Sequence, residues 1–241
     1  MLKVDLHTHT ADDPLDRISY TACQLIDRAA ALGYDALAIT LHDRQFDVRT
    51  LASYADARGI VLIPGIERTI EGRHVLLLNF PPETEAVRSF ADLARLRRHR
   101  EGLVVAPHPF FPSTTCLLGH MNRHHDLLDA VEYNAMFTAS VNFNLIAERW
   151  ARSWSKQMVG NGDVHRLDQL GTTYSLVDAD RNPASICRAI AEGRVHVVSQ
   201  PLAWTMAVRI VTSIAVSSLD FRSRTPQPAR APVSYSEAGR Q

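Results

Sequence analysis

Cysteine is scarce in this 241-residue chain, and the cysteines present form no recognisable pair. Cys23, Cys116 and Cys187 are far apart, odd in number and without a C-x-x-C spacing. This argues against a disulfide framework and against a zinc ribbon. The N-terminus carries Asp5 and His7 where a secretion signal would have a basic and then an apolar region, so we expect a cytoplasmic protein.

An excess of either charge is also absent. Twenty-six Lys and Arg residues balance twenty-six Asp and Glu residues. This argues against a protein built mainly to coat nucleic acid, although it leaves room for a local basic patch. The sequence contains no G-x-G-x-x-G, P-loop or G-x-S-x-G motif, so neither a nucleotide cofactor nor a Ser-His-Asp nucleophile is indicated.

No apolar run of membrane-spanning length is free of charge. Residues 202–219 come nearest, but Arg209 lies in their middle, where a bilayer would cost about 2.5–3.5 kcal/mol. We therefore expect a helix packed on the protein and no membrane partner; the same segment could instead form an interface, and the oligomeric state stays open. Residues 221–241 are rich in Pro, Ser, Ala and Arg, which predicts a disordered tail after one domain over residues 1–220.

The rest of the chain alternates short runs of Val, Ile and Leu with stretches of helical period, which is typical of a βα-repeating α/β architecture. Ser19 is expected to cap the first helix and Gly33 to end it. Predicted strands cover residues 3–9, 36–42, 60–67, 74–80, 103–108, 130–134, 158–163, 172–177 and 195–199. Predicted helices cover residues 19–32, 48–58, 83–100, 142–154 and 183–192.

Metal-ligand residue types occur at the ends of these strands. His7 and His9 are two residues apart on one strand, so their side chains point to the same face. If the strands form a closed barrel, their C-terminal ends meet at one rim. A hairpin through Gly72 would return His74 to the same rim beside Glu67. The residues at strand ends are His7, His9, His42, Glu67, His108, Asp163 and His165.

A single histidine at a strand end is usually structural, but packing does not require imidazole at so many of them. Imidazole together with carboxylate suits Zn, Mn or Fe, and Glu67 could bridge two ions. We expect the remaining histidines to be solvated or structural, with substrate contact as an alternative for the 120–125 group. They are His99, His120, His124, His125 and His196.

Five motifs in order carry a family resemblance: DLHTHT, AITLHD, PGIE followed by RHVLLLNF, APHPF, and NGDVHRLDQLG. Together they resemble the polymerase-and-histidinol-phosphatase (PHP) family of metal-dependent phosphoesterases over residues 1–200. The resemblance implies a distorted (β/α)7 barrel with two or three divalent ions at the C-terminal rim of the strands. The ligands it implies are His7, His9, Asp13 (with Asp12 as the alternative), His42, Glu67, His74, His108, Asp163 and His165.

Two motifs depart from the family pattern. The second motif is often Thr-Asp-His, whereas Leu41 precedes the histidine here and Asp43 follows it. The last motif usually reads Ser-Asp-Ala-His and here has Gly162 and Val164 around the aspartate. Both motifs keep their ligands, so we expect an intact metal site.

These residues predict a hydrolase that cleaves a small phosphorylated metabolite or nucleotide with a metal-activated hydroxide. Glu67, Asp163 and His165 are the expected catalytic residues, with His165 acting as a ligand. Arg44, Arg68 and Arg166 lie within two residues of predicted ligands and are candidates for phosphate binding. A metal-dependent nuclease is the alternative, and a non-catalytic metal-stabilised module is less favoured because the ligand set is complete.

Overall fold

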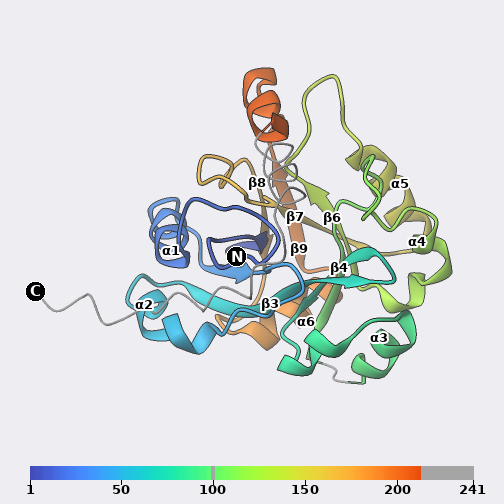
Figure 1. Cartoon of the computed structure of the whole chain (residues 1–241), viewed down its shortest axis with the longest axis horizontal. Helices are drawn as coiled ribbons and strands as arrows, with labels where there is room; N and C mark the ends of the chain where they lie inside the picture. Colours follow the sequence, from blue (N-terminus) through green and yellow to red (C-terminus); the bar gives the residue numbers. More distant parts are fainter. Residues whose placement is uncertain (99–100, 213–241) are drawn as a thin grey trace, which may run out of the picture.

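The computed structural model describes residues 1–98 and 101–212, and a single sheet runs through them (Figure 1). The sheet has nine strands in the order β7-β6-β5-β4-β3-β2-β1-β8-β9. The strands are β1 (Leu2–Thr8), β2 (Ala36–Ile39), β3 (Val61–Ile70), β4 (Arg73–Leu78), β5 (Leu103–Ala106), β6 (Ala130–Asn134), β7 (Gln157–Asn161), β8 (Thr173–Val177) and β9 (Val195–Ser199).

The sheet curls into a nearly closed barrel, because β7 and β9, at opposite ends of the strand order, contact each other. Gly160 makes this closure sterically feasible. A Cβ atom there would lie 2.7 Å from the Tyr174 carbonyl oxygen and 2.9 Å from a Val197 methyl. The Gly160 N–H donates to Ser175 Oγ at 2.8 Å, which ties β7 to β8. The α/β barrel expected from the sequence is confirmed.

A regular seven-fold β/α repeat is not what the described residues form. Four pairs run parallel: β1–β2, β2–β3, β5–β6 and β6–β7. Four others run antiparallel: β1–β8, β3–β4, β4–β5 and β8–β9. The β3–β4 hairpin follows from its two-residue turn, because Glu71 and Gly72 both have positive φ, as a type I′ turn requires.

The helices lie outside the sheet, and several differ from the predicted ranges. Thr21, not Ser19, caps α1, and it forms a capping box with Gln24. The predicted helix over residues 83–100 is two elements, because Val87 is extended and Ser89 starts a new cap. The α-helices are α1 (Ala22–Ala31), α2 (Ala52–Asp56), α3 (Phe90–Leu96), α4 (His120–Arg123), α5 (Asn144–Ser153) and α6 (Pro183–Ala191). Short 3-10 turns are η1 (Val48–Leu51), η2 (Pro82–Ala86) and η3 (His125–Leu127).

Three apolar clusters hold the layers together. One packs α1 and α2 on β2 and the start of β3, and a second packs α3, α4 and α5 on β4, β5 and β6. The third joins the strands to α6 through Ile186 and Ile190. In Figure 1, α1 and α2 therefore lie on one flank of the sheet and α3 to α5 on the other.

The last described residues, 204–212, form a helix, as expected for the first part of the 202–219 segment. Leu202 N donates to the Phe137 carbonyl at 2.8 Å, and Ile210 is buried, but Trp204, Val208 and Val211 are exposed. The end of that segment, the boundary at residue 220 and the predicted tail lie outside the described residues.

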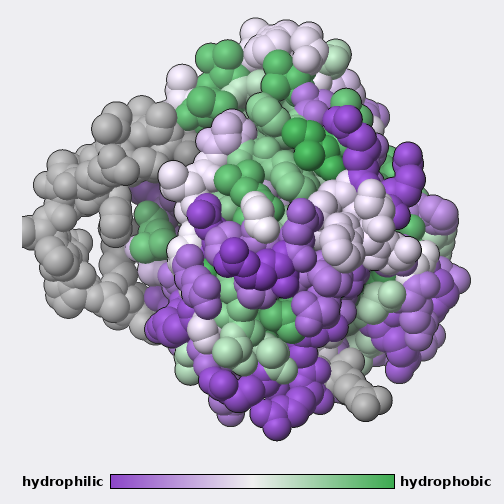
Figure 2. Space-filling model, turned by 90° about the vertical axis from the view of Figure 1, so that its right-hand side faces the viewer, coloured by the Kyte–Doolittle hydropathy of each residue, from purple (hydrophilic) through white to green (hydrophobic). Residues whose placement is uncertain are grey.

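No helix in the described part of the chain has the length and hydrophobicity to cross a membrane. Figure 2 views the flank that carries α3, α4 and α5, where hydrophobic and hydrophilic patches are interspersed. Leu145 and Ile146 of α5 are among its exposed apolar residues.

Candidate metal centre

The two histidines of the first motif lie at the end of β1 and share a face, as their spacing predicts. Their ring centroids are 5.2 Å apart, and both side chains are fully buried. His7 Nδ1 faces Glu132 Oε1 at 2.8 Å, and His9 Nδ1 faces Asp13 Oδ2 at 2.9 Å. The Nε2 atom of each ring therefore points inward, 3.3 Å (His7) and 3.4 Å (His9) from Glu67 Oε2.

Glu67 stands at the centre of five imidazoles. Besides His7 and His9, its Oε2 faces His42 Nε2 at 3.1 Å. Its Oε1 faces His74 Nδ1 at 2.7 Å and His108 Nε2 at 3.1 Å. The hairpin brings His74 back beside Glu67, because His74 pairs with Thr69 in the β3–β4 register. One buried carboxylate thus presents both oxygens to imidazoles from three strand ends and a hairpin.

The close packing of imidazoles and carboxylates shifts the pKa values of Glu67 and His42. Burial opposes the charged form of Glu67, but His74, His7 and His42 outweigh it and hold its pKa well below the usual range. Burial would lower the pKa of His42, yet Glu67 and Asp13 raise it to about 10. A metal ion would replace the protons as the cation between these groups.

Asp163 is a further carboxylate that faces this cluster. Its Oδ1 lies 3.4 Å from His7 Nε2 and 3.6 Å from His9 Nε2, and its Oδ2 accepts from Asn134 Nδ2 at 3.1 Å. Asp163 and His108 both have positive φ, so each turns out of the strand line just after β7 and β5. The strained backbone aims these two side chains into the cluster.

The loop after β1 supplies two carboxylates, of which the sequence reasoning named one. Asp13 Oδ2 faces His9 Nδ1 and also His42 Nδ1 at 3.0 Å, and its Oδ1 accepts two backbone N–H groups. Asp16 was missed, yet its Oδ2 lies 2.8 Å from His165 Nε2 and 3.6 Å from His42 Nδ1. Asp13 as a ligand stays a prediction, and Asp16 is an additional candidate in the same loop.

The sequence also did not reveal which side chains hold the ligand imidazoles in place. Asp43 and Asp168 lie close in sequence to predicted ligands, but Asp43 pairs with Arg68, and Asp168 pairs with Arg166. Glu132 holds His7 instead, and the buried Cys116 Sγ lies 3.4 Å from His108 Nδ1. A glutamate inside the apolar strand Ala130–Asn134 was the available signal, because a buried charge requires partners.

The three predicted phosphate-binding arginines differ in placement. Arg68 follows Glu67 on β3, so its side chain points to the opposite face, where it is buried and bonds Asp43 and the Val87 carbonyl. This does not fit substrate binding. Arg44 is half-buried, and Arg166 lines a surface hollow beside His165, paired with Asp168 at 3.0 Å.

The other histidines lie apart from this cluster. His124 stacks on Phe90 with ring centroids 3.8 Å apart, and His120 stacks on the same ring at 5.6 Å. His125 packs on Trp154 at 4.0 Å, and His196 lies within β9. His99 lies outside the described residues. The division between cluster and structural histidines therefore matches the geometry for those described.

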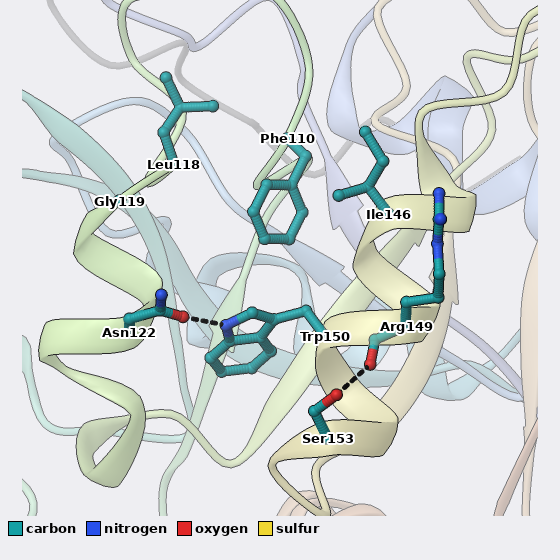
Figure 3. Close-up of a pocket in the computed structure, with 8 residues that line it drawn as sticks. All are labelled: Phe110, Leu118, Gly119, Asn122, Ile146, Arg149, Trp150 and Ser153. Atoms are coloured by element: carbon teal, nitrogen blue, oxygen red, sulfur yellow. Dashed lines mark hydrogen bonds between the residues drawn. The ribbon is translucent and has the colours of Figure 1, made fainter.

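A second hollow, of about 440 Å³, opens between the turn before α4 and the helix α5 (Figure 3). Phe110 points into it above Trp150, whose indole N–H donates to Asn122 at 2.7 Å, and Arg149 lies at its edge. Phe110 is two residues from His108, so an aromatic surface lies close in sequence to the cluster. The predicted metal ligands do not line this hollow.

The cluster fits divalent cations on the chemistry of its donors. Among the described residues, Nε2 of His7 and Nε2 of His9 are buried without a hydrogen-bond partner, which is costly unless something else binds them. Five overlapping groups of three ligand atoms lie within 4.8 Å of one another. They are His7, His108 and Asp163; His7, His9 and Glu67; His9, Asp13 and His42; His9, Asp163 and His165; and His42, Glu67 and His74.

Comparison with known proteins agrees with this architecture. Residues 142–195, from α5 into β9, match the family model described as PHP-associated. The structure is similar to a two-domain protein from Bacteroides vulgatus that contains a predicted PHP-like metal-dependent phosphoesterase, with a TM-score of 0.64 and 17% identity over 88% of this chain and 69% of that one. The chain therefore has the fold of a PHP-like protein. A search of curated proteins found no match.

Other solved structures share this fold. PsfC from Pseudomonas syringae is 19% identical over 91% of this chain and 98% of its own, with a TM-score of 0.61. The lesion-specific endonuclease EndoQ from Pyrococcus furiosus is 15% identical over 96% of this chain and 74% of its own, with a TM-score of 0.55. At these identities the likeness establishes the fold, and the chemistry has to be argued from the residues.

Proposed function

We propose that this chain is a metal-dependent phosphoesterase that hydrolyses a small phosphorylated metabolite or nucleotide. The observation that carries the proposal is the buried Glu67 carboxylate, which has both oxygens within 3.4 Å of imidazoles from separate elements. A carboxylate shared in this way is suited to bridge two cations.

The chain's own residues would hold the ions in overlapping sets around Glu67. His7 and His9 present Nε2 to Oε2, and Asp163 Oδ1 faces the same two nitrogens. His74 and His108 present ring nitrogens to Oε1. Asp13 or Asp16 with His42 and His165 would serve a further ion. Bound divalent ions would supply an acidic water and polarise the phosphoryl oxygens, and no protein nucleophile is needed.

Side chains beside the predicted metal ligands would bind the substrate. Arg166 forms a fork-like pair with Asp168, through Nε and Nη2 at 3.0 Å each, and it lies next to His165. A phosphate could take the place of that carboxylate, since guanidinium binds both in the same bidentate geometry. The reaction adds water across the P–O ester bond and releases phosphate and an alcohol.

A nuclease is the second candidate. The endonuclease EndoQ, which has been solved with a 27-mer duplex containing an abasic lesion, shares the fold with a TM-score of 0.56. The balanced charge of this chain, with 26 basic and 26 acidic residues, favours a small substrate over a polyanion.

The test is hydrolysis by the full chain, stripped with a chelator and resupplied with Mn²⁺ or Zn²⁺. An aryl phosphate monoester, an aryl phosphate diester and a duplex with an abasic lesion are compared. Faster turnover of the monoester supports the proposal, and cleavage of the duplex alone supports the nuclease. Absence of metal-dependent hydrolysis of all three would refute both.

A further inference from the structure

Glu132 lies behind the metal centre and faces only hydrogen-bond donors. It is fully buried in the middle of β6. Oε1 lies 2.8 Å from His7 Nδ1 and 3.0 Å from Asn161 Nδ2. Oε2 accepts from the backbone N–H of His108 at 2.7 Å and from Asn134 Nδ2 at 3.0 Å.

This pattern fixes the orientation of His7. An ionised carboxylate only accepts, so His7 Nδ1 must carry the proton, and Nε2 is directed into the cluster with its lone pair available when the ring is neutral. The geometry agrees, since Nε2 is buried and lacks a hydrogen-bond partner among the described residues.

Two more predicted ligands are tied to the same carboxylate. The bond to the His108 N–H anchors the residue whose φ is +29°, just where the chain leaves β5. Asn134 spans Glu132 and Asp163, since its Nδ2 also donates to Asp163 Oδ2 at 3.1 Å. His7, His108 and Asp163 are one of the groups whose ligand atoms lie within 4.8 Å of one another.

We propose that Glu132 is a positioning residue that sets the geometry of the ion held by His7, His108 and Asp163. It approaches the cluster from β6 without being a predicted ligand, and it is joined to that group by one side-chain bond, one backbone bond and one bridge through Asn134. This inference rests on the proposed metal centre but not on the identity of the substrate.

An amide cannot replace this carboxylate. Glutamine at position 132 would offer one oxygen and one NH₂ group to four donors, so the NH₂ would face two N–H groups wherever it pointed. His7 or the His108 backbone would lose its acceptor. Outer partners of ligating histidines typically change metal affinity by about 10–100-fold.

The experiment measures Co²⁺ binding to the metal-free full chain by competition with a chelating indicator, together with the visible d–d spectrum of the bound ion. For Glu132→Gln we expect a Co²⁺ affinity about 10–100-fold lower at one site and an altered d–d spectrum. Asp129→Asn is the matched control. Asp129 precedes β6 and pairs with Arg97 at 2.8 Å, away from the cluster. The Co²⁺ affinity and spectrum of the Asp129→Asn variant should therefore match those of the wild type.

A second variant, Asn134→Ala, removes the bridge between Glu132 and Asp163 and should weaken Co²⁺ binding several-fold. If Glu132→Gln does not fold, wild-type Co²⁺ affinity in Asn134→Ala would overturn the inference. Wild-type affinity and spectrum in a folded Glu132→Gln variant would overturn the inference while leaving the proposed function intact. Failure of the wild-type chain to bind Co²⁺ would overturn both.

Discussion

Replacing Glu67 with glutamine should remove the group that holds the metal centre together. The carboxylate contacts five imidazoles at 2.7–3.4 Å and is 1% exposed. Near neutral pH the metal-free cluster is held by imidazolium–carboxylate attraction, and removing one partner of a buried ion pair costs about 3–5 kcal/mol. For a chain of this size, that cost corresponds to a fall in Tm of roughly 6–20 °C.

The same change should impair metal binding and catalysis. Losing the bridging ligand should release at least one ion per chain and lower kcat by about 10³-fold, which is equivalent to about 4 kcal/mol. The assays are elemental analysis, thermal unfolding with and without Mn²⁺, and hydrolysis of an aryl phosphate.

His124→Ala is the control for this prediction, because His124 stacks on Phe90 outside the cluster. It should lose about 0.5–1.5 kcal/mol of packing and no metal. Equal loss of metal in both variants, or full metal content and turnover in Glu67→Gln, would show that Glu67 does not hold the metal centre.

Three further predictions concern charge and packing around the centre. The metal-free protein should lose stability as pH rises from about 6.5 to about 10. Glu67 and Asp13 raise the pKa of His42 to about 10, and a raised pKa stabilises the fold only while the native group keeps its proton. Urea titrations across this pH range check the direction of the change. Arg68→Ala should cost about 3–5 kcal/mol of unfolding free energy and Arg166→Ala less than about 1 kcal/mol; similar denaturation midpoints would contradict the placement of Arg68. Gly162→Ala should weaken Mn²⁺ binding, since the added Cβ would lie 2.4 Å from a Val164 methyl. Adding Val164→Ala should recover part of the Mn²⁺ affinity. If the double variant binds Mn²⁺ no better than the single one, this contact is not the cause.

Much of the barrel could be predicted from local pattern. Strands β6 and β9 have the predicted bounds, because apolar runs flanked by polar residues define them. The convergence of His7, His42 and His108 followed from a single geometric rule, that strand ends in a barrel meet at one rim. Glu67 joins them from inside β3, which runs on to Ile70 in the hairpin with β4.

Local pattern failed where competing signals lie close together. Thr21 caps α1 in place of Ser19 because Gln24 is three residues further on and completes a capping box. The 83–100 segment breaks because Ser89 and Asp92 form a second capping box within it. Helix ends are decided by such side-chain to backbone bonds, which apolar periodicity does not register.

The partners of the ligands could not be derived from sequence. Glu132 reaches His7 across 125 residues, and Asp16 reaches His165 across 149. Such contacts depend on how β6 and the loop after β1 are placed in three dimensions. The sequence could indicate that a buried glutamate needs partners, but not which partners it has.

Metal content shows whether the cluster around Glu67 binds divalent ions. The measurement is elemental analysis of this chain, freshly purified, repeated after dialysis against Mn²⁺ or Zn²⁺. We expect two or more ions per wild-type chain and at least one fewer in Glu67→Gln. A well-folded wild-type chain that holds no metal after either dialysis would contradict this expectation.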